Sequence, residues 1–237
     1  MILTVHARKG GVGKSTLACN LAAAWAGKGK NVLLVDTDAQ GTAGAMLGIR
    51  EPEMGLADVL RGALPIEHAV SATSMDRLFL LPGGEALETI TQTQMHALRD
   101  GVSRFDGLVL MDTPPGRSAI ATEALNAAAG ILVPAVLRVA DIWGVADTVN
   151  RLGDKVLGVV PSMVDRRVSA TESLLGMMRD EIGHLLTPGV PISSRTADAV
   201  AYGVPVVEWD KVTRAAVAFQ DIAKDIEKRC RKRGLTI

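Results

Sequence analysis

A short stretch near the start of the chain combines two lysines, three glycines and two hydroxyl side chains, a set suited to binding phosphate. Residues 9–16 read K-G-G-V-G-K-S-T. The glycines let the backbone curl so that successive N–H groups point inward at one anion. The second lysine can reach the β- and γ-phosphates of a nucleotide, and the serine hydroxyl after it can bind Mg²⁺. The predicted phosphate site consists of Lys9, Gly10, Gly11, Val12, Gly13, Lys14, Ser15 and Thr16.

Three aspartates follow apolar runs farther along the chain. Asp36 and Asp38 come after the run 32–35, and Asp112 follows the run 107–111. In open α/β sheets, ligands collect at the carboxyl ends of the strands. We therefore treat these three carboxylates as candidates for the same site as the phosphate loop.

The elements that must position these residues alternate between short apolar runs and longer helical patterns. Such alternation predicts an α/β fold with a mainly parallel sheet and helices on both faces. We expect one domain over residues 1–237, because no repeat or linker interrupts the pattern. The predicted strands cover 2–7, 31–37, 77–81, 107–111, 130–135 and 156–160, with a short seventh at 190–193. The predicted helices cover 15–28, short turns within 42–70, the segment 85–100, and a long amphipathic helix from Val212, whose apolar face continues through Ala216, Phe219, Ile222, Ile226 and Cys230.

Composition excludes several classes of protein. The 26 basic and 26 acidic side chains cancel, so any nucleic-acid contact needs a local basic patch. The two cysteines, Cys19 and Cys230, have no spacing typical of a disulfide framework, a zinc site or an iron–sulfur cluster. The longest apolar stretch, 124–137, is broken by asparagine, glycine and proline, and the chain starts directly in a strand. We expect a soluble, cytoplasmic protein.

The phosphate loop departs from the usual pattern in an informative way. Arg8 stands where that pattern has a glycine, and Lys9 adds a second lysine. This is the deviant Walker A pattern, K-G-G-x-G-K-[ST]-[ST], and here the sequence closely resembles the ParA/MinD family of P-loop ATPases. Four further segments carry the resemblance, most closely to the short ParA/Soj partition ATPases that lack an N-terminal helix-turn-helix. They are residues 32–41 (with Ala39 where these proteins usually have proline), 105–116, and the pair 159–167 and 191–210.

The resemblance implies ATP and Mg²⁺ as cofactors and gives roles to individual residues. Lys9 would reach across a dimer interface to the phosphates held by the partner subunit. Lys14 would bind the phosphates of its own subunit, and Asp38 would orient the attacking water. Ser15, Asp36 and Asp112 would form the magnesium shell. Thr113-Pro114-Pro115-Gly116 lies where the γ-phosphate would be sensed.

Two further sites follow from the resemblance. The segment 163–167, with Met163 and Asp165, is expected to border the adenine. Arg167 and Arg195 match positions that bind DNA. Arg166, Lys211, Arg214 and the basic tail 228–233 could extend that patch, although the tail is equally explained as a solvated helix end.

The family offers three tasks for one ATP-driven dimerisation cycle. In DNA partition, the ATP-bound homodimer binds DNA without sequence preference, and a ParB-like centromere-binding partner stimulates slow hydrolysis. The second is the positioning of another cargo on the nucleoid, with the same chemistry. The third is MinD-like membrane positioning, which we do not favour, because the last helix is needed to pack the domain. We expect partition, in a cytoplasmic, nucleoid-associated protein that does not bind membranes.

Overall fold

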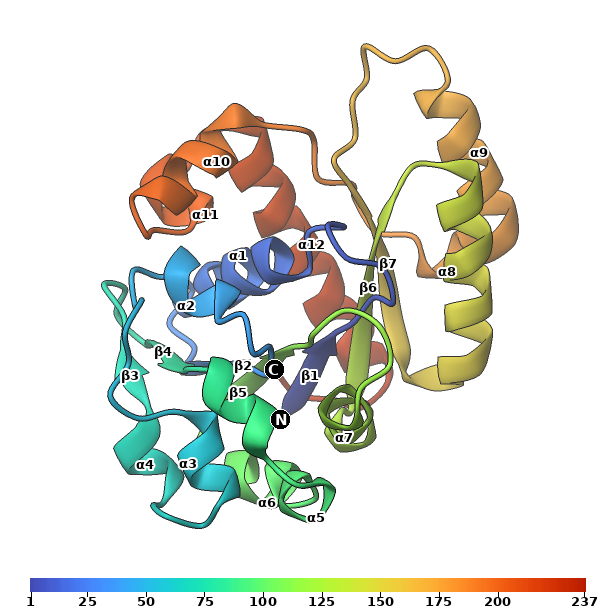
Figure 1. Cartoon of the computed structure of the whole chain (residues 1–237). Helices are drawn as coiled ribbons and strands as arrows, with labels where there is room; N and C mark the ends of the chain where they lie inside the picture. The colour runs from blue at the N-terminus through green and yellow to red at the C-terminus, as the bar shows by residue number, and fades with distance from the viewer.

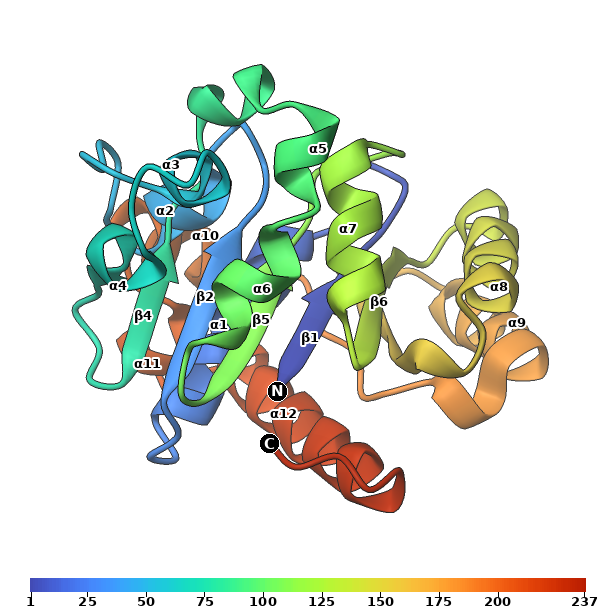
Figure 2. The same cartoon turned by 90° about the horizontal axis from the view of Figure 1, so that it is seen from below.

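The computed structural model describes residues 1–237 and has one seven-stranded sheet between two layers of helices (Figures 1 and 2). The strand order is β3-β4-β2-β5-β1-β6-β7, and every pair is parallel except β3 with β4. The strands are β1 Ile2–Val5, β2 Val32–Asp36, β3 Ser71–Ala72, β4 Leu78–Leu81, β5 Leu108–Asp112, β6 Gly130–Val136 and β7 Val156–Ser162. This architecture confirms the predicted α/β fold with a mainly parallel sheet.

The central strands β2 and β5 are apolar up to their terminal aspartates because helices cover both of their faces. Every residue of β2 and of β5 is buried. β1 lies between β5 and β6, so the chain returns to both sides of its first strand. In sheets of this kind, ligands bind beyond the carboxyl ends of the central strands. The loop after β1 is therefore placed at the expected binding edge.

One helical layer packs the first helix and the last helix together against the sheet. It comprises α1 Lys14–Ala26, α2 Thr42–Met46, α10 Ser194–Ala201, α11 Val206–Trp209 and α12 Arg214–Lys232. Their apolar side chains share a core with the strands, including the fully buried Trp25 and Phe219. α12 begins directly after Thr213, whose hydroxyl accepts a hydrogen bond from the Ala216 N–H at 3.2 Å.

The opposite layer is made of shorter helices, which Figure 2 shows in front of the strands. It comprises α3 Leu56–Leu60, α4 Ile66–Ala69, η1 Glu85–Thr89, α5 Gln92–Met95, α6 Leu98–Ser103 and α7 Ala119–Ala127. At the β6–β7 end, a third apolar cluster packs beneath α8 Val139–Leu152 and α9 Thr171–Ile182. Two 3₁₀ turns, η2 Gly153–Lys155 and η3 Gly183–Leu185, follow these two helices.

Three sequence-based expectations differ from the structure. The predicted helix 85–100 is broken into η1, α5 and the start of α6. The predicted strand 190–193 is no strand, and only Pro191 forms an isolated bridge, to Val164. The seventh strand is instead the two-residue β3 at the other edge. Val212, the expected start of the apolar face of the last helix, lies outside that helix, because Thr213 is the N-cap and α12 begins at Arg214. Its side chain is therefore not packed in the core, and 87% of its surface is exposed.

No helix in the structure has the length and apolar character needed to cross a bilayer.

The packing of α12 gives a prediction about stability. Ile222 of α12 is fully buried in the core that this helix shares with α1 and the sheet, whereas Val217 on the same helix is 43% exposed. Ile222→Ala should lower the free energy of unfolding by about 2–5 kcal/mol, because it removes apolar packing and leaves a cavity. Val217→Ala should change it by less than about 0.5 kcal/mol. Urea titrations monitored by tryptophan fluorescence measure both, and equal effects would contradict the assigned faces of α12.

Candidate nucleotide-binding site

The loop after β1 forms an open cradle of backbone that leads into α1. Gly11 and Gly13 have positive φ angles of 71° and 88°, which side chains with a Cβ rarely adopt. Gly13 is also the N-cap of α1, so the free N–H groups of that helix face the loop. A helix N-terminus preceded by such a glycine loop is suited to binding phosphate.

Lys14 is the cation at the centre of this cradle. Only 7% of its surface is exposed, and its Nζ has no hydrogen-bond or ion-pair partner. Burial lowers the pKa of Lys14, while the charges of Asp112 and Asp38 oppose that shift. A buried ammonium group without a direct partner is stabilised by an anion that enters the site.

Asp36 and Asp38 form a tight turn at the end of β2. The Asp36 carboxylate accepts hydrogen bonds from the N–H groups of Asp38 and Ala43, both at 3.0 Å. Burial nevertheless raises the pKa of Asp36 to about 6. Asp38 is only half-buried, and its Oδ1 accepts a hydrogen bond from the Gln40 N–H at 3.0 Å. The turn thus fixes the backbone of Asp38 and leaves part of its carboxylate accessible.

Gly83 is a residue of this site that sequence reasoning passed over. A Cβ at this position would lie 2.5 Å from the carbonyl oxygen of Asp38 and 2.7 Å from that of Asp36. Backbone contacts this close exclude every other residue type. The P-G-G stretch after β4 identified only the end of a strand, and nothing in it indicated which turn it would pack against.

Asp112 is the buried carboxylate opposite Lys14. It is paired in register with Asp36 across β2 and β5, and both of its oxygens are buried without a hydrogen-bond partner. Burial, with the nearby Asp36 charge, raises the pKa of Asp112 to about 8, although Ser15 and Lys14 counteract it. Unpartnered carboxylate oxygens beside a serine hydroxyl are the donor set that Mg²⁺ and its water ligands prefer. Ser15, Asp36 and Asp112 therefore fit a hydrated magnesium ion.

Lys9 lies apart from this buried group, on the outer side of the loop. Its Nζ contacts the two carboxylate oxygens of Asp141 on α8 at 2.7 and 3.0 Å. The neighbouring Arg8 pairs with Asp147 on the same helix at 3.0 Å. The sequence did not indicate these two acidic partners, because they lie more than 130 residues away. The structure thus separates the two loop lysines, one inward and one outward.

The segment after Asp112 is tied back to the phosphate loop. The Thr113 hydroxyl donates to the Val5 carbonyl at 3.0 Å and so accepts from Nδ1 of His6 at 3.1 Å. Burial, with the Lys14 charge, lowers the pKa of His6 to about 4 and keeps the ring neutral. The Gly116 N–H donates to the Arg8 carbonyl at 2.8 Å. The segment 113–116 is therefore fastened at both of its ends to β1 and the loop that follows it.

A cavity of about 260 Å³ adjoins the phosphate loop on the side of α10. Gly13 and Thr16 line it together with Met163 and Thr196. Met163 has a φ of 54°, a backbone conformation that is rare for a residue with a side chain. Asp165, the other residue expected here, does not line this cavity and lies in the neighbouring groove.

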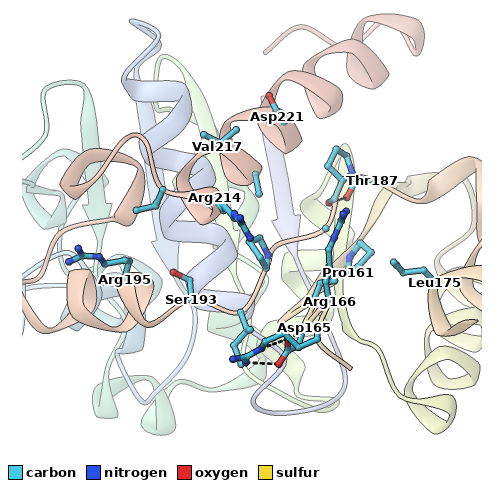
Figure 3. A pocket seen from close by; sticks show the side chains of 18 of the residues that line it. Pro161, Asp165, Arg166, Leu175, Thr187, Ser193, Arg195, Arg214, Val217 and Asp221 are labelled. Carbon is cyan, nitrogen blue, oxygen red and sulfur yellow. Dashed lines mark hydrogen bonds and ion pairs between the residues drawn. The ribbon is translucent and has the colours of Figure 1, made fainter. Parts of the chain in front are cut away.

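That neighbouring groove, of about 1230 Å³, is lined by both Arg167 and Arg195. Figure 3 shows Arg195 and Asp165 among its lining residues. The Arg167 guanidinium donates to both carboxylate oxygens of Asp165, at 2.9 and 2.7 Å. The Arg195 guanidinium lies 5.7 Å from the ring centre of Trp209, which in turn stacks on Tyr202. The structure therefore brings the two arginines to one groove, each with an intramolecular partner.

The basic tail is only partly solvated. Arg229 pairs with Asp225 at 2.7 Å and donates to the carbonyl of Leu186, while Arg233 donates to the carbonyl of Val156. These two arginines fasten α12 to β7 and to the segment beside it. Their structural role removes them from any extended basic patch.

The buried position of Lys14 gives a prediction about nucleotide binding. Lys14→Ala should weaken ATP binding roughly 100-fold or more, because it removes a charge-assisted hydrogen bond to each of two phosphates. Equilibrium binding of a fluorescent ATP analogue measures this, with Lys224→Ala as a control on the surface. Thermal unfolding of the ligand-free variant establishes that it is folded. If Lys14→Ala bound ATP with the affinity of the wild-type protein, the assignment of this loop to phosphate binding would be wrong.

The raised pKa of Asp112 gives a prediction about pH. A carboxyl whose pKa rises from 3.8 to about 8 on folding binds more protons in the folded state than in the unfolded state. The free energy of unfolding of the ligand-free protein should therefore fall as the pH rises from about 4 to about 8. Asp112→Asn should flatten this dependence, and the exposed Asp106→Asn should not. Chemical denaturation at several pH values measures it, and an unchanged profile in Asp112→Asn would contradict the assigned cause.

Comparisons with known proteins show the family of this chain. A family model described as an AAA domain matches residues 1–156. The chromosome partitioning protein ParA of Caulobacter vibrioides is 31% identical over 98% of this chain and 96% of its own. The chromosome-partitioning ATPase Soj of Thermus thermophilus is 33% identical over 94% and 93%. The septum site-determining protein MinD of Pyrococcus horikoshii, solved with Mg-ADP, has the same fold, with a TM-score of 0.84, 22% identity and coverage of 96% of each chain. The chain belongs to the ParA/MinD family of P-loop ATPases.

Proposed function

We propose that this protein is a DNA partition ATPase whose ATP-bound homodimer binds DNA without sequence preference and releases it after hydrolysis. The observation that carries this proposal is the similarity to two chromosome partitioning proteins over nearly the whole chain. The geometry of the site supports the chemical part, because the buried cation and the unpartnered carboxylate suit a magnesium–triphosphate.

In this proposal the triphosphate lies on the loop 9–16, with Lys14 against its β- and γ-phosphates. Ser15 and Asp112 would hold a hydrated magnesium ion, with Asp36 supporting them from the adjacent strand, and the ion would supply positive charge against the phosphates. The adenine enters the cavity beside Gly13, whose volume of about 260 Å³ and apolar walls suit a purine.

Asp38 is the residue that we assign to the attacking water. Its Oδ1 already accepts the Gln40 N–H, so the remaining oxygen is left to orient a water molecule. Its backbone is fixed by the close approach of Gly83. Segment 113–116, hydrogen-bonded to the loop, relays the presence of the γ-phosphate to the surface.

Lys9 is the residue that connects ATP to dimerisation. In the free subunit it pairs with Asp141, and its own side chain is 53% exposed. The Asp141 side chain is only 12% exposed, but the Lys9 ammonium is open to solvent, which screens the pair, so a triphosphate in a second subunit can compete for Lys9. In the dimer, Lys9 then stabilises the charge that develops on the phosphate oxygens of the other subunit, as an arginine finger would.

The remaining parts of the proposal concern partners. Arg167 and Arg195 contribute to a DNA-binding surface that doubles when two subunits join, and a ParB-like protein stimulates slow hydrolysis. The protein then works in the cytoplasm on the nucleoid. Positioning of another cargo would use the same chemistry with a different adaptor.

DNA retention by Asp38→Ala protein tests the proposal directly. This variant should bind ATP, hydrolyse it at least roughly 100-fold more slowly, and accumulate as a dimer. It should retain DNA with ATP but not with ADP or without nucleotide, and retention should fall steeply as the salt concentration rises. Electrophoretic mobility shifts and light scattering across a salt series measure both properties. Absence of retention in every nucleotide state would discard the DNA role, and undiminished turnover would remove Asp38 from catalysis.

A further inference from the structure

A cavity of about 520 Å³ lies on the outer side of the phosphate loop, between that loop, the carboxyl half of β6 and α8. Figure 1 shows α8 beside β6 at this end of the sheet. The walls of the cavity are mostly small apolar residues. Its charged lining residues are Arg8, Lys9, Arg117 and Asp141. Three cations thus share one cavity with a single carboxylate.

The Asp141 carboxylate depends on Lys9 for its charge partner. The Asp141 side chain is largely buried. Both of its carboxylate oxygens accept hydrogen bonds from the Lys9 ammonium group, at 2.7 and 3.0 Å, and no other group of the protein donates to them. If Lys9 leaves, Asp141 loses its only partner, and a largely buried charge without a partner is unfavourable.

The two arginines that line this cavity differ in their pairing. Arg8 is already paired, because its guanidinium donates to Asp147 at 3.0 Å. Arg117 is exposed, and its guanidinium takes part in no hydrogen bond or ion pair of the structure. Since Lys9 occupies both oxygens of Asp141, Arg117 has no free carboxylate to bind in the cavity. Arg117 is therefore the one lining cation that is available for a new partner.

The backbone on either side of Arg117 is fixed, whereas its side chain is free. On one side, the Gly116 N–H donates to the Arg8 carbonyl at 2.8 Å. On the other side, Ser118 is the N-cap of α7, and its hydroxyl accepts a hydrogen bond from a backbone N–H of that helix at 3.2 Å. Arg117 therefore stays beside the phosphate loop, directly after the segment 113–116 to which we assign the sensing of the γ-phosphate.

We infer that Arg117 takes over the Asp141 carboxylate when Lys9 turns to the triphosphate of the partner subunit. The inference rests on the proposed function, in which Lys9 leaves Asp141 as two subunits join. The exchange keeps a cation beside the largely buried carboxylate in both states, so the release of Lys9 leaves no charge without a partner. A guanidinium group also matches the two oxygens of a carboxylate as a bidentate donor.

This exchange makes Arg117 a positioning residue for the ATP-dependent dimer. It acts through Lys9, because it replaces Lys9 at Asp141 and so frees the lysine for the second subunit. A direct contact between Arg117 and the triphosphate of the second subunit is the alternative role for an unpaired arginine beside the loop. The two roles differ in one measurable respect, since only the exchange depends on the Asp141 carboxylate.

A double-mutant cycle of Arg117 and Asp141 tests the inference in protein loaded with a non-hydrolysable ATP analogue. Arg117→Ala should weaken dimerisation roughly 10-fold, because Asp141 then competes for Lys9 with the triphosphate of the second subunit. In an Asp141→Asn background, where Lys9 has no carboxylate to leave, the same substitution should change dimerisation by less than about 2-fold. Arg117→Lys should restore part of the loss, since lysine keeps the positive charge. Arg104→Ala, at an exposed arginine without a partner outside the cavity, is the matched control and should leave dimerisation unchanged.

The readouts separate this inference from the proposed function. Sedimentation velocity across a protein concentration series measures the dimer dissociation constant, while a fluorescent ATP analogue and thermal unfolding verify that each variant is loaded and folded. If Arg117→Ala dimerises as the wild-type protein does, the inference is wrong and the proposed function stands. An equal loss with and without the Asp141 carboxylate would also overturn it, and would assign Arg117 to direct contact with the triphosphate of the second subunit. If wild-type protein loaded with the analogue does not dimerise, the proposed function itself fails, and the exchange fails with it.

Discussion

The rest of the molecule is organised around a buried arrangement of charges at the carboxyl edge of the sheet. Asp36 and Asp112 face each other in register on neighbouring strands, and Lys14 lies beside them at the start of α1. All three are almost fully buried, and neither Lys14 nor Asp112 has a hydrogen-bond partner. Removing charges from water is costly unless they are paired, so this edge is stabilised by a ligand that brings both signs. A magnesium ion bound to a triphosphate brings both.

The fold keeps these charges in place with backbone that has little freedom to move. The parallel register of β2 and β5 sets the distance between the two carboxylates, and the turn after β2 gives Asp36 two N–H donors. Gly83 packs its backbone directly on that turn. A site held this way needs no rearrangement of its strands when ligand enters, which is the preorganisation that electrostatic catalysis requires.

Sequence reasoning predicted the backbone elements correctly where their pattern is local. The glycine loop between β1 and α1 is a run of consecutive residues, and β2 and β5 are runs of apolar residues that end in aspartate. It failed where the outcome depends on partners distant in the chain. The ion pair between Lys9 and Asp141 could not be predicted from the sequence, because it depends on how α8 packs beside the loop. The helix predicted over 85–100 breaks because Thr91 starts a new turn, with its hydroxyl and the Gln94 side chain forming a reciprocal cap.

The arginine groove illustrates the same limit and also connects the two ends of the proposed cycle. A sequence shows which residues are basic without indicating which are already paired. Arg167 was assigned to DNA binding with no sign in the sequence of its ion pair with Asp165. Residues 191–193 line both this groove and the cavity beside Gly13, so one short segment forms a wall of each. If the adenine occupies the cavity, as proposed above, it lies against the same segment that leads into α10 and Arg195. On that proposal ATP would act on the groove through this shared wall within one subunit, because ordering one side of the wall restricts the other.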